Sequence, residues 1–148
     1  MAKKTKSIMQ DKESGQCYLC RLLHNDYGIK RIREEHHVIF GTANRKLSEK
    51  YGLKVYLCLA HHETGKEAVH KNAEVANLLK QEAQKVFMRT YPDLDFREIF
   101  GKNYLTENEL AYEKNRMAYK RNMDFRWYVD RYCESQSVEL EEALRMCW

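Results

Sequence analysis

Metal-ligand spacing is the first chemical signal in this sequence. Cys17 and Cys20 form a Cys-x-x-Cys pair, and Cys58 and His61 form a Cys-x-x-His pair further along the chain. Two such pairs supply four tetrahedral ligands, and thiolates with an imidazole suit Zn²⁺ and leave no open position. We therefore predict a structural zinc site, which stabilises a unit too small to build a large core. The alternative is that the cysteines are unrelated reduced thiols.

The second signal is that four of the six histidines stand in two adjacent pairs, in EEHHVIF and in CLAHH. Neighbouring residues of a strand point to opposite faces, so His36 and His37 are expected to serve different tasks. On a helix, neighbours diverge by about 100°, so His61 can join the zinc while His62 points elsewhere. Two alternatives remain open. His62 rather than His61 completes the zinc site, or the first pair is one core and one exposed histidine.

Two strands and a short helix are expected to position these residues. β-branched and aromatic residues predict a strand over 33–40, and alternation predicts another over 53–59. The stretch 41–52 is bounded by glycines and lacks apolar periodicity, so we expect a connecting loop with at most one helical turn near its end. A short helix is expected over 60–72, interrupted by Gly65.

The remaining sequence is predicted to be helical, since one proline and 6 glycines favour helices over a sandwich or barrel. One helix should begin at Ala73 and end before Pro92, and a short one should end at Gly101. Thr106 opens a capping box and predicts a long helix to about Cys133, with a last helix after Ser137. The expected fold is α+β, with a flexible basic tail (1–14), a zinc-stabilised unit (15–72), supporting helices (73–105) and a helical extension (106–148).

Charge is distributed unevenly along the chain. Residues 1–71 carry 14 Lys and Arg against 8 Asp and Glu, and this is the part that holds the metal-ligand patterns. The surplus is compatible with a polyanionic partner or with a solubilising surface. No apolar run approaches the ~18 residues of a membrane span. The N-terminus lacks the apolar core of a secretory signal, so a cytoplasmic location with reduced cysteines and no membrane partner is expected.

The motifs CYLC, EHHV and LCLAHH resemble, in this order, those of the HNH endonucleases, the ββα-metal family. The similarity covers roughly residues 17–72 and is closest to small phage and prophage members, such as the recombination-enhancement group of RecA-dependent nucleases. It implies a zinc-stabilised ββα-metal unit that hydrolyses DNA phosphodiester bonds in a bacterial host or phage-infected cell. DNA, and a recombination protein, are the partners that this resemblance implies.

The resemblance also implies roles for the remaining histidines. His37 would be the general base that activates water, and the catalytic divalent metal would be held by His36, His62 and His70. That metal would be Mg²⁺, Mn²⁺, Ni²⁺ or Zn²⁺; imidazole ligands suit the last three, whereas Mg²⁺ prefers oxygen. For His70 the alternative is a surface histidine at a helix end.

The chain departs from the family pattern at two places. Gly52 or Leu53 occupies the position of an asparagine that precedes the second strand in most members, and Lys66 lies where the final histidine usually falls. These departures leave a second function class open, a non-catalytic zinc module that binds nucleic acid or a protein partner.

Four basic residues lie between the two expected strands or at the start of the second, and are candidates for contacts to backbone phosphates. The alternative for this group is an ordinary solvated loop. The four residues are Arg45, Lys46, Lys50 and Lys54.

Overall fold

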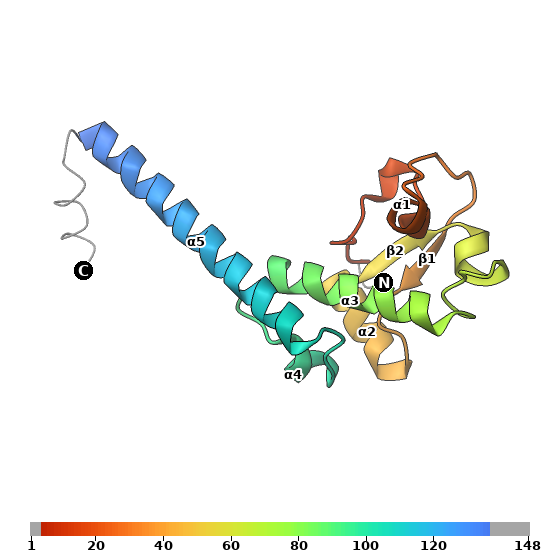
Figure 1. Cartoon of the computed structure of the whole chain (residues 1–148). Helices are drawn as coiled ribbons and strands as arrows, with labels where there is room; N and C mark the ends of the chain where they lie inside the picture. Colours follow the sequence, from red (N-terminus) through yellow and green to blue (C-terminus); the bar gives the residue numbers. More distant parts are fainter. Residues whose placement is uncertain (1–3, 137–148) are drawn as a thin grey trace. The chain divides into compact units, whose positions relative to one another are not determined.

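The structure is a computed structural model that describes residues 4–136, with the side chains of residues 4–127. Two compact units divide after Thr106 (Figure 1). The first contains a two-stranded sheet and several helices, and the second contains the long helix α5 (Glu107–Gln136). The predicted α+β class is therefore confirmed. The expected zinc-stabilised unit and supporting helices form one compact unit rather than two.

The sheet consists of β1 (Glu34–His37) and β2 (Lys54–Leu57), which pair antiparallel. Both strands lie where they were predicted but are shorter. In the register, His36 is opposite Val55 and His37 is opposite Lys54. Because side chains alternate along a strand, His36 and Val55 share one face of the sheet, while His37 and Lys54 share the other.

Helix α2 (Thr42–Tyr51) replaces the connecting loop that the sequence predicted. Its anchor is Ser48, which is fully buried. The Ser48 hydroxyl donates to the Ile39 carbonyl at 2.8 Å and accepts from the Ile39 amide at 3.2 Å. Gly52 ends the helix in the left-handed conformation, at φ 72°. Tertiary contacts thus stabilise a helix whose own apolar pattern is too weak to predict it.

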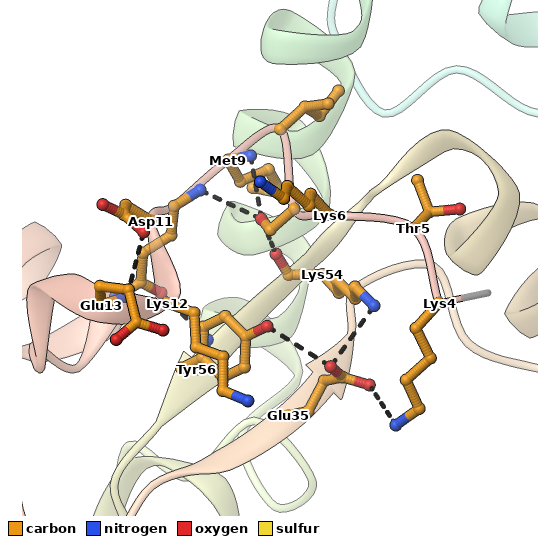
Figure 2. Close-up of a pocket in the computed structure, with 13 residues that line it drawn as sticks. Lys4, Thr5, Lys6, Met9, Asp11, Lys12, Glu13, Glu35, Lys54 and Tyr56 are labelled. Atoms are coloured by element: carbon orange, nitrogen blue, oxygen red, sulfur yellow. Dashed lines mark hydrogen bonds and ion pairs between the residues drawn. The ribbon is translucent and has the colours of Figure 1, made fainter.

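The N-terminal segment, expected to be a flexible tail, packs along β2 over its described part, residues 4–14 (Figure 2). The Ile8 amide donates to the Gly52 carbonyl at 3.0 Å, and Met9 is buried in the core. A Cβ on Gly52 would lie 2.4 Å from the Lys6 carbonyl oxygen. The segment can lie this close because Gly52 has no side chain. The segment ends in the short helix η1 (Lys12–Ser14).

Two short helices carry Cys20, His24, His61 and His62. Helix α1 (Tyr18–His24) follows Cys17, and η2 (Ala60–Thr64) is a five-residue π-helical turn after β2. The Gly65 amide closes this turn by donating to the Ala60 carbonyl at 2.8 Å. A Cβ at residue 65 would lie 2.5 Å from the same carbonyl oxygen, so the turn requires glycine there. The predicted interruption at Gly65 is confirmed.

Helices α3 (Ala73–Thr90) and α4 (Phe96–Phe100) complete the first unit. Asn72 caps α3 by accepting from two backbone amides, and the helix ends before Pro92 as predicted. Phe87 is fully buried at the centre of an aromatic cluster with Phe96 and Phe100. This cluster and the buried face of the sheet form the core that supports the histidine-bearing segments.

The second unit is described as a single long helix, in agreement with the predicted helix after Thr106. The last helix expected after Ser137 lies outside the described residues. Within residues 4–136, no helix is both long and apolar enough to cross a membrane.

Candidate metal centres

The four predicted zinc ligands come together from two segments that are distant in sequence. Cys17 and Cys20 lie at the start of α1, whereas Cys58 follows β2 and His61 lies in the π turn η2. Cys17, Cys20 and His61 are buried, and Cys58 is partly buried. The predicted grouping of these residues is confirmed, and His61 rather than His62 joins the cysteines.

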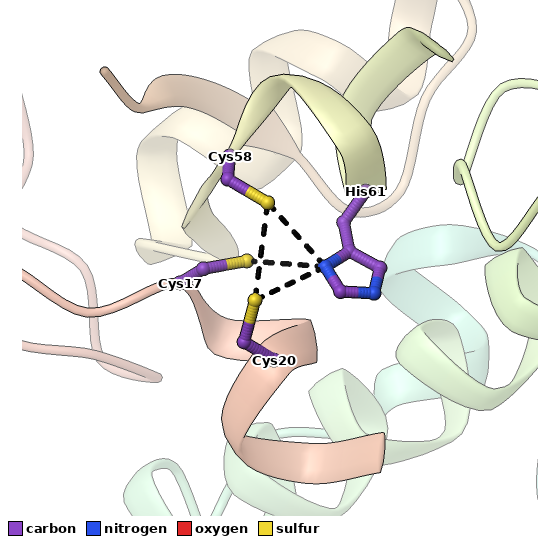
Figure 3. Close-up of side chains that lie close together, drawn as sticks. All are labelled: Cys17, Cys20, Cys58 and His61. Carbon is purple, nitrogen blue, oxygen red and sulfur yellow. Dashed lines mark hydrogen bonds between the residues drawn. The ribbon is translucent and has the colours of Figure 1, made fainter. Parts of the chain in front are cut away.

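The geometry of this group, called here the cysteine–histidine cluster, fits a tetrahedral metal ion (Figure 3). His61 Nδ1 lies 3.6 Å from Cys17 Sγ, 3.3 Å from Cys20 Sγ and 3.4 Å from Cys58 Sγ. The sulfur atoms of Cys20 and Cys58 are 3.9 Å apart. Zinc bond lengths at a tetrahedral angle place sulfur and nitrogen ligands about 3.5 Å apart and two sulfurs about 3.8 Å apart. The cluster therefore has the donor set and the spacing of a structural zinc site.

Electrostatics also favour a cation at the cysteine–histidine cluster. Burial, followed by the neighbouring Cys17 and Cys58 sulfur groups, raises the pKa of the Cys20 thiol to about 12. Several thiolates so close together repel one another, and a bound divalent cation offsets that repulsion.

A carboxylate contacts the ring nitrogen of His61 that faces away from the cysteines. His61 Nε2 lies 3.3 Å from Glu67 Oε2, which also bonds His24 Nε2 at 2.6 Å. The His24 ring stacks on His61 with centroids 5.7 Å apart. When the Glu67 carboxylate accepts a hydrogen bond from His61 Nε2–H, the proton stays on Nε2 and the lone pair of Nδ1 faces the sulfurs. Sequence reasoning assigned no role to His24 or Glu67, because neither has ligand spacing.

The other three predicted metal-binding histidines form a second group, called here the three-histidine cluster. His36 comes from β1, His62 from η2, and His70 from the turn before α3. The ring centroids are 4.8 to 5.4 Å apart, and the Nε2 atoms of His62 and His70 are 3.1 Å apart. Nitrogen ligands of a tetrahedral ion are about 3.4 Å apart, so small adjustments bring these atoms to ligand spacing.

His36 has a buried nitrogen atom without a partner. The residue is 4% exposed, and among the described residues no group hydrogen-bonds to its Nε2. Burial, then the nearby His70 and His62, lowers the pKa of His36 to about 3, so its ring is neutral. A neutral imidazole with an unused lone pair can coordinate a metal ion, and a buried polar atom without a partner otherwise costs stability.

A second carboxylate orients His62. Glu34 on β1 accepts a hydrogen bond from His62 Nδ1, which leaves Nε2 with its lone pair beside His70. A cavity of about 270 Å³ opens on the cluster. Its lining residues are Glu35, His36, His37, Phe40, Arg45, His62 and His70.

His37 lies on the opposite face of β1 but borders the same cavity. Its Nε2 lies 2.7 Å from Glu49 Oε2 on α2. Burial raises the pKa of Glu49, but hydrogen bonds from His37, Lys54 and the Thr5 amide outweigh it and lower the pKa to about 2. Glu49 is therefore an anion that accepts from Nε2–H of His37 and leaves Nδ1 as the basic nitrogen.

The four candidate phosphate contacts do not form one group. Arg45, Lys46 and Lys50 are exposed on α2, and Arg45 also lines the cavity. Lys54 differs from the prediction, since it is 1% exposed and its ammonium group is paired with Glu49 and Glu35. We expected Lys54 to face solvent because it is charged. In the structure, α2 and the N-terminal segment cover this face of β2.

Comparisons with protein-family models, with curated proteins and with solved structures found no match for this chain. The site is therefore characterised by its own geometry. It combines a closed cysteine–histidine cluster, an open three-histidine cluster and a histidine–glutamate pair that border one another.

Proposed function

We propose that the protein is a metal-dependent endonuclease of the HNH type that hydrolyses phosphodiester bonds in DNA. The observation that carries this proposal is the buried His36 Nε2, which has no partner among the described residues and lies beside His62 and His70. Such a nitrogen suits a metal ligand, and the cavity on which it opens also contains a candidate base, His37.

In this proposal His36, His62 and His70 hold the catalytic divalent metal. When bound, such an ion stabilises charge on the phosphate and on the leaving 3′ oxygen. Three imidazole donors favour Zn²⁺, Ni²⁺ or Mn²⁺ over Mg²⁺. Three protein ligands leave a coordination position open for substrate, as in catalytic zinc sites.

His37 takes the proton from the attacking water. The water oxygen forms a bond to phosphorus, the bond from phosphorus to the 3′ oxygen breaks, and solvent protonates the released oxygen. Glu49 supports this role because it accepts from Nε2–H at 2.7 Å and so keeps the ring in the tautomer with a basic Nδ1. The exposed Arg45, Lys46 and Lys50 on α2 contact the phosphate backbone in a sequence-independent way.

Plasmid nicking tests the proposal. Zinc-loaded wild type is assayed with added Mg²⁺, Mn²⁺, Ni²⁺ or Zn²⁺, beside His36→Ala and His37→Ala. Both variants should lose about 100-fold or more in rate. Lys85→Met is a control for substitution as such, because Lys85 pairs with Glu82 within α3. If folded wild type nicks DNA with none of these metals, the enzyme proposal is wrong.

The alternative is a non-catalytic zinc module that binds nucleic acid through the basic face of α2. Under this alternative the protein binds DNA without cleaving it, and His36→Ala leaves the DNA affinity unchanged. A gel-shift titration beside the nicking assay separates the two functions, because the endonuclease loses cleavage but keeps DNA binding when His36 is replaced.

A further inference from the structure

Lys54 is a buried cation between two carboxylates, as Figure 2 shows for the Glu35 side. Its ammonium nitrogen lies 3.1 Å from each oxygen of Glu49 and 3.4 Å from Glu35 Oε2. The side chain is 2% exposed, whereas Lys4, which approaches Glu35 at 3.5 Å, is 79% exposed. The Lys54 side chain is thus shielded from solvent, and its ammonium group is paired with these two carboxylates.

Glu49 is held on both of its oxygen atoms. Oε2 accepts from His37 at 2.7 Å and from Lys54 at 3.1 Å, while Oε1 accepts from the Thr5 amide at 2.9 Å and from Lys54 at 3.1 Å. Lys54 bridges the two oxygens, so the carboxylate cannot rotate without breaking at least one of these bonds. The orientation of the His37 ring therefore depends on Lys54 as well as on Glu49, the residue to which the ring is hydrogen-bonded.

From this geometry we propose that Lys54 is a positioning residue for the base, acting on His37 through Glu49. The inference rests on the proposed nuclease function for its catalytic consequence, but the geometric part stands without it. Lys54 neutralises the repulsion between Glu35 and Glu49, which would otherwise turn Glu49 away from His37. The sequence suggested a phosphate contact for this lysine, and its burial reassigns it to the support of the base.

The N-terminal segment completes the same support. The Thr5 amide bonds Glu49, and the Ser7 hydroxyl donates to the Lys54 carbonyl. The N-terminal segment therefore helps to cover the Lys54 ammonium group, while Glu35 and Glu49 stay partly exposed, and burial of the cation strengthens its interaction with both carboxylates. Lys54→Met removes one partner of this network and leaves Glu35 and Glu49 uncompensated, which costs stability, so its effect on catalysis is measured in folded protein.

Kinetics of Lys54→Met provide the first test. The variant should lose about 10- to 100-fold in kcat, the range typical for groups that orient an active residue, with KM and bound metal unchanged. Lys85→Met is the matched control, since it removes a lysine from a local ion pair in α3. Unchanged kcat in folded Lys54→Met, or a change confined to KM, would overturn the proposal.

A double-mutant cycle tests whether Lys54 acts through Glu49. In a Glu49→Gln background, Lys54→Met should cause little further loss, because the residue through which it acts is already altered. If the two losses multiply, Lys54 acts by another route and the proposal is wrong.

Nitrogen NMR of the His37 ring tests the inference without any activity. Wild type should show the Nε2–H tautomer, and folded Lys54→Met should show a mixture of both tautomers. If Lys54→Met does not fold, Lys54→Gln provides a second neutral variant whose amide replaces part of the lost packing. A retained Nε2–H tautomer in the folded variant overturns the positioning role. A wild type that never cleaves DNA overturns the proposed function instead.

Discussion

The cysteine–histidine and three-histidine clusters meet at a single peptide bond, between His61 and His62, yet they differ in donor set and in access. The first has four donors, three of them sulfur, and the donors complete a tetrahedron. The second has three nitrogen donors and opens on a cavity of about 270 Å³. A closed thiolate-rich site stabilises a fold, whereas an open imidazole site can accept a substrate.

The two adjacent histidines also use opposite ring nitrogens. His61 turns Nδ1 toward the sulfurs and Nε2 toward Glu67, whereas His62 turns Nε2 toward His70 and Nδ1 toward Glu34. A carboxylate thus selects the tautomer at each cluster. The five-residue π turn allows two neighbouring side chains to serve separate sites, in keeping with the occurrence of such turns at functional positions.

The largest expected effect comes from opening the closed cluster. Cys58→Ser should lose both zinc and the folded first unit, because structural zinc contributes about 10–16 kcal/mol in small domains. That exceeds or equals the whole stability of most domains, about 5–15 kcal/mol. Metal analysis with circular dichroism measures both losses. A wild type that stays folded with the same melting temperature after zinc chelation would contradict the structural role.

The open cluster should behave differently. His36→Ala should remove the second metal and about 100-fold or more of the nicking rate, because Lewis-acid stabilisation is worth several kcal/mol. Fold and zinc at the cysteine–histidine cluster should be retained. In zinc-saturated protein, metal content should fall from two equivalents to one. Loss of both equivalents would show that the two clusters are not separable.

Gly65→Ala should damage both clusters together. The new Cβ would lie 2.5 Å from the Ala60 carbonyl oxygen, so the π turn must open. We expect a loss of about 1–3 kcal/mol in unfolding free energy, with weaker binding at both metal sites. Gly101→Ala is the control for a loss of stability away from the clusters: its Cβ position is open, but its φ of 77° is strained for alanine, so it should lower stability and leave zinc affinity unchanged. Thermal unfolding at fixed zinc concentration compares them, and equal zinc affinity in Gly65→Ala and wild type would contradict the expectation.

The smallest expected effects come from replacing the carboxylates that contact the two clusters, Glu67 and Glu34. Glu67→Gln should weaken zinc at the cysteine–histidine cluster, and Glu34→Gln should weaken metal at the three-histidine cluster, each by about 10- to 100-fold. Competition titrations with a chelator measure both affinities in each variant. The expected result is that each substitution affects its own cluster, and an equal effect of Glu34→Gln on both would remove the distinction between them.

Local signals in the sequence predicted the cysteine–histidine cluster and most helices. The ligand spacing of Cys17 and Cys20, and the apolar periodicity from Ala73 that ends before Pro92, act over a few residues and can be recognised there. The carboxylate partners could not be predicted, because Glu49 meets His37 only after α2 folds against β1. The same holds for α2 itself, whose anchor is a tertiary contact.

Lys54 shows a second limit of sequence reasoning. Alternation along KVYL identifies which residues share a face, but it cannot tell that the polar face is covered by another segment. Burial of this lysine depends on the N-terminal segment, which approaches closely because Gly52 has no side chain. A residue predicted to meet DNA therefore lies inside the molecule, beside Glu35 and Glu49.

The segment EEHHVI, which contains β1 and the two residues after it, is composed of three successive like pairs, so sliding it by one residue would present almost the same side chains to each face. Most half-buried strands resist such a slip because it exchanges apolar and polar faces. In this segment the two faces carry nearly the same residues, so its composition hardly distinguishes the observed register from one shifted by a residue. The choice is made by Ser48, whose hydroxyl binds both backbone groups of Ile39, and by the Val38 amide bonded to the Leu53 carbonyl. Ser48 on α2 and this backbone bond thus help to decide which histidine faces the three-histidine cluster and which meets Glu49.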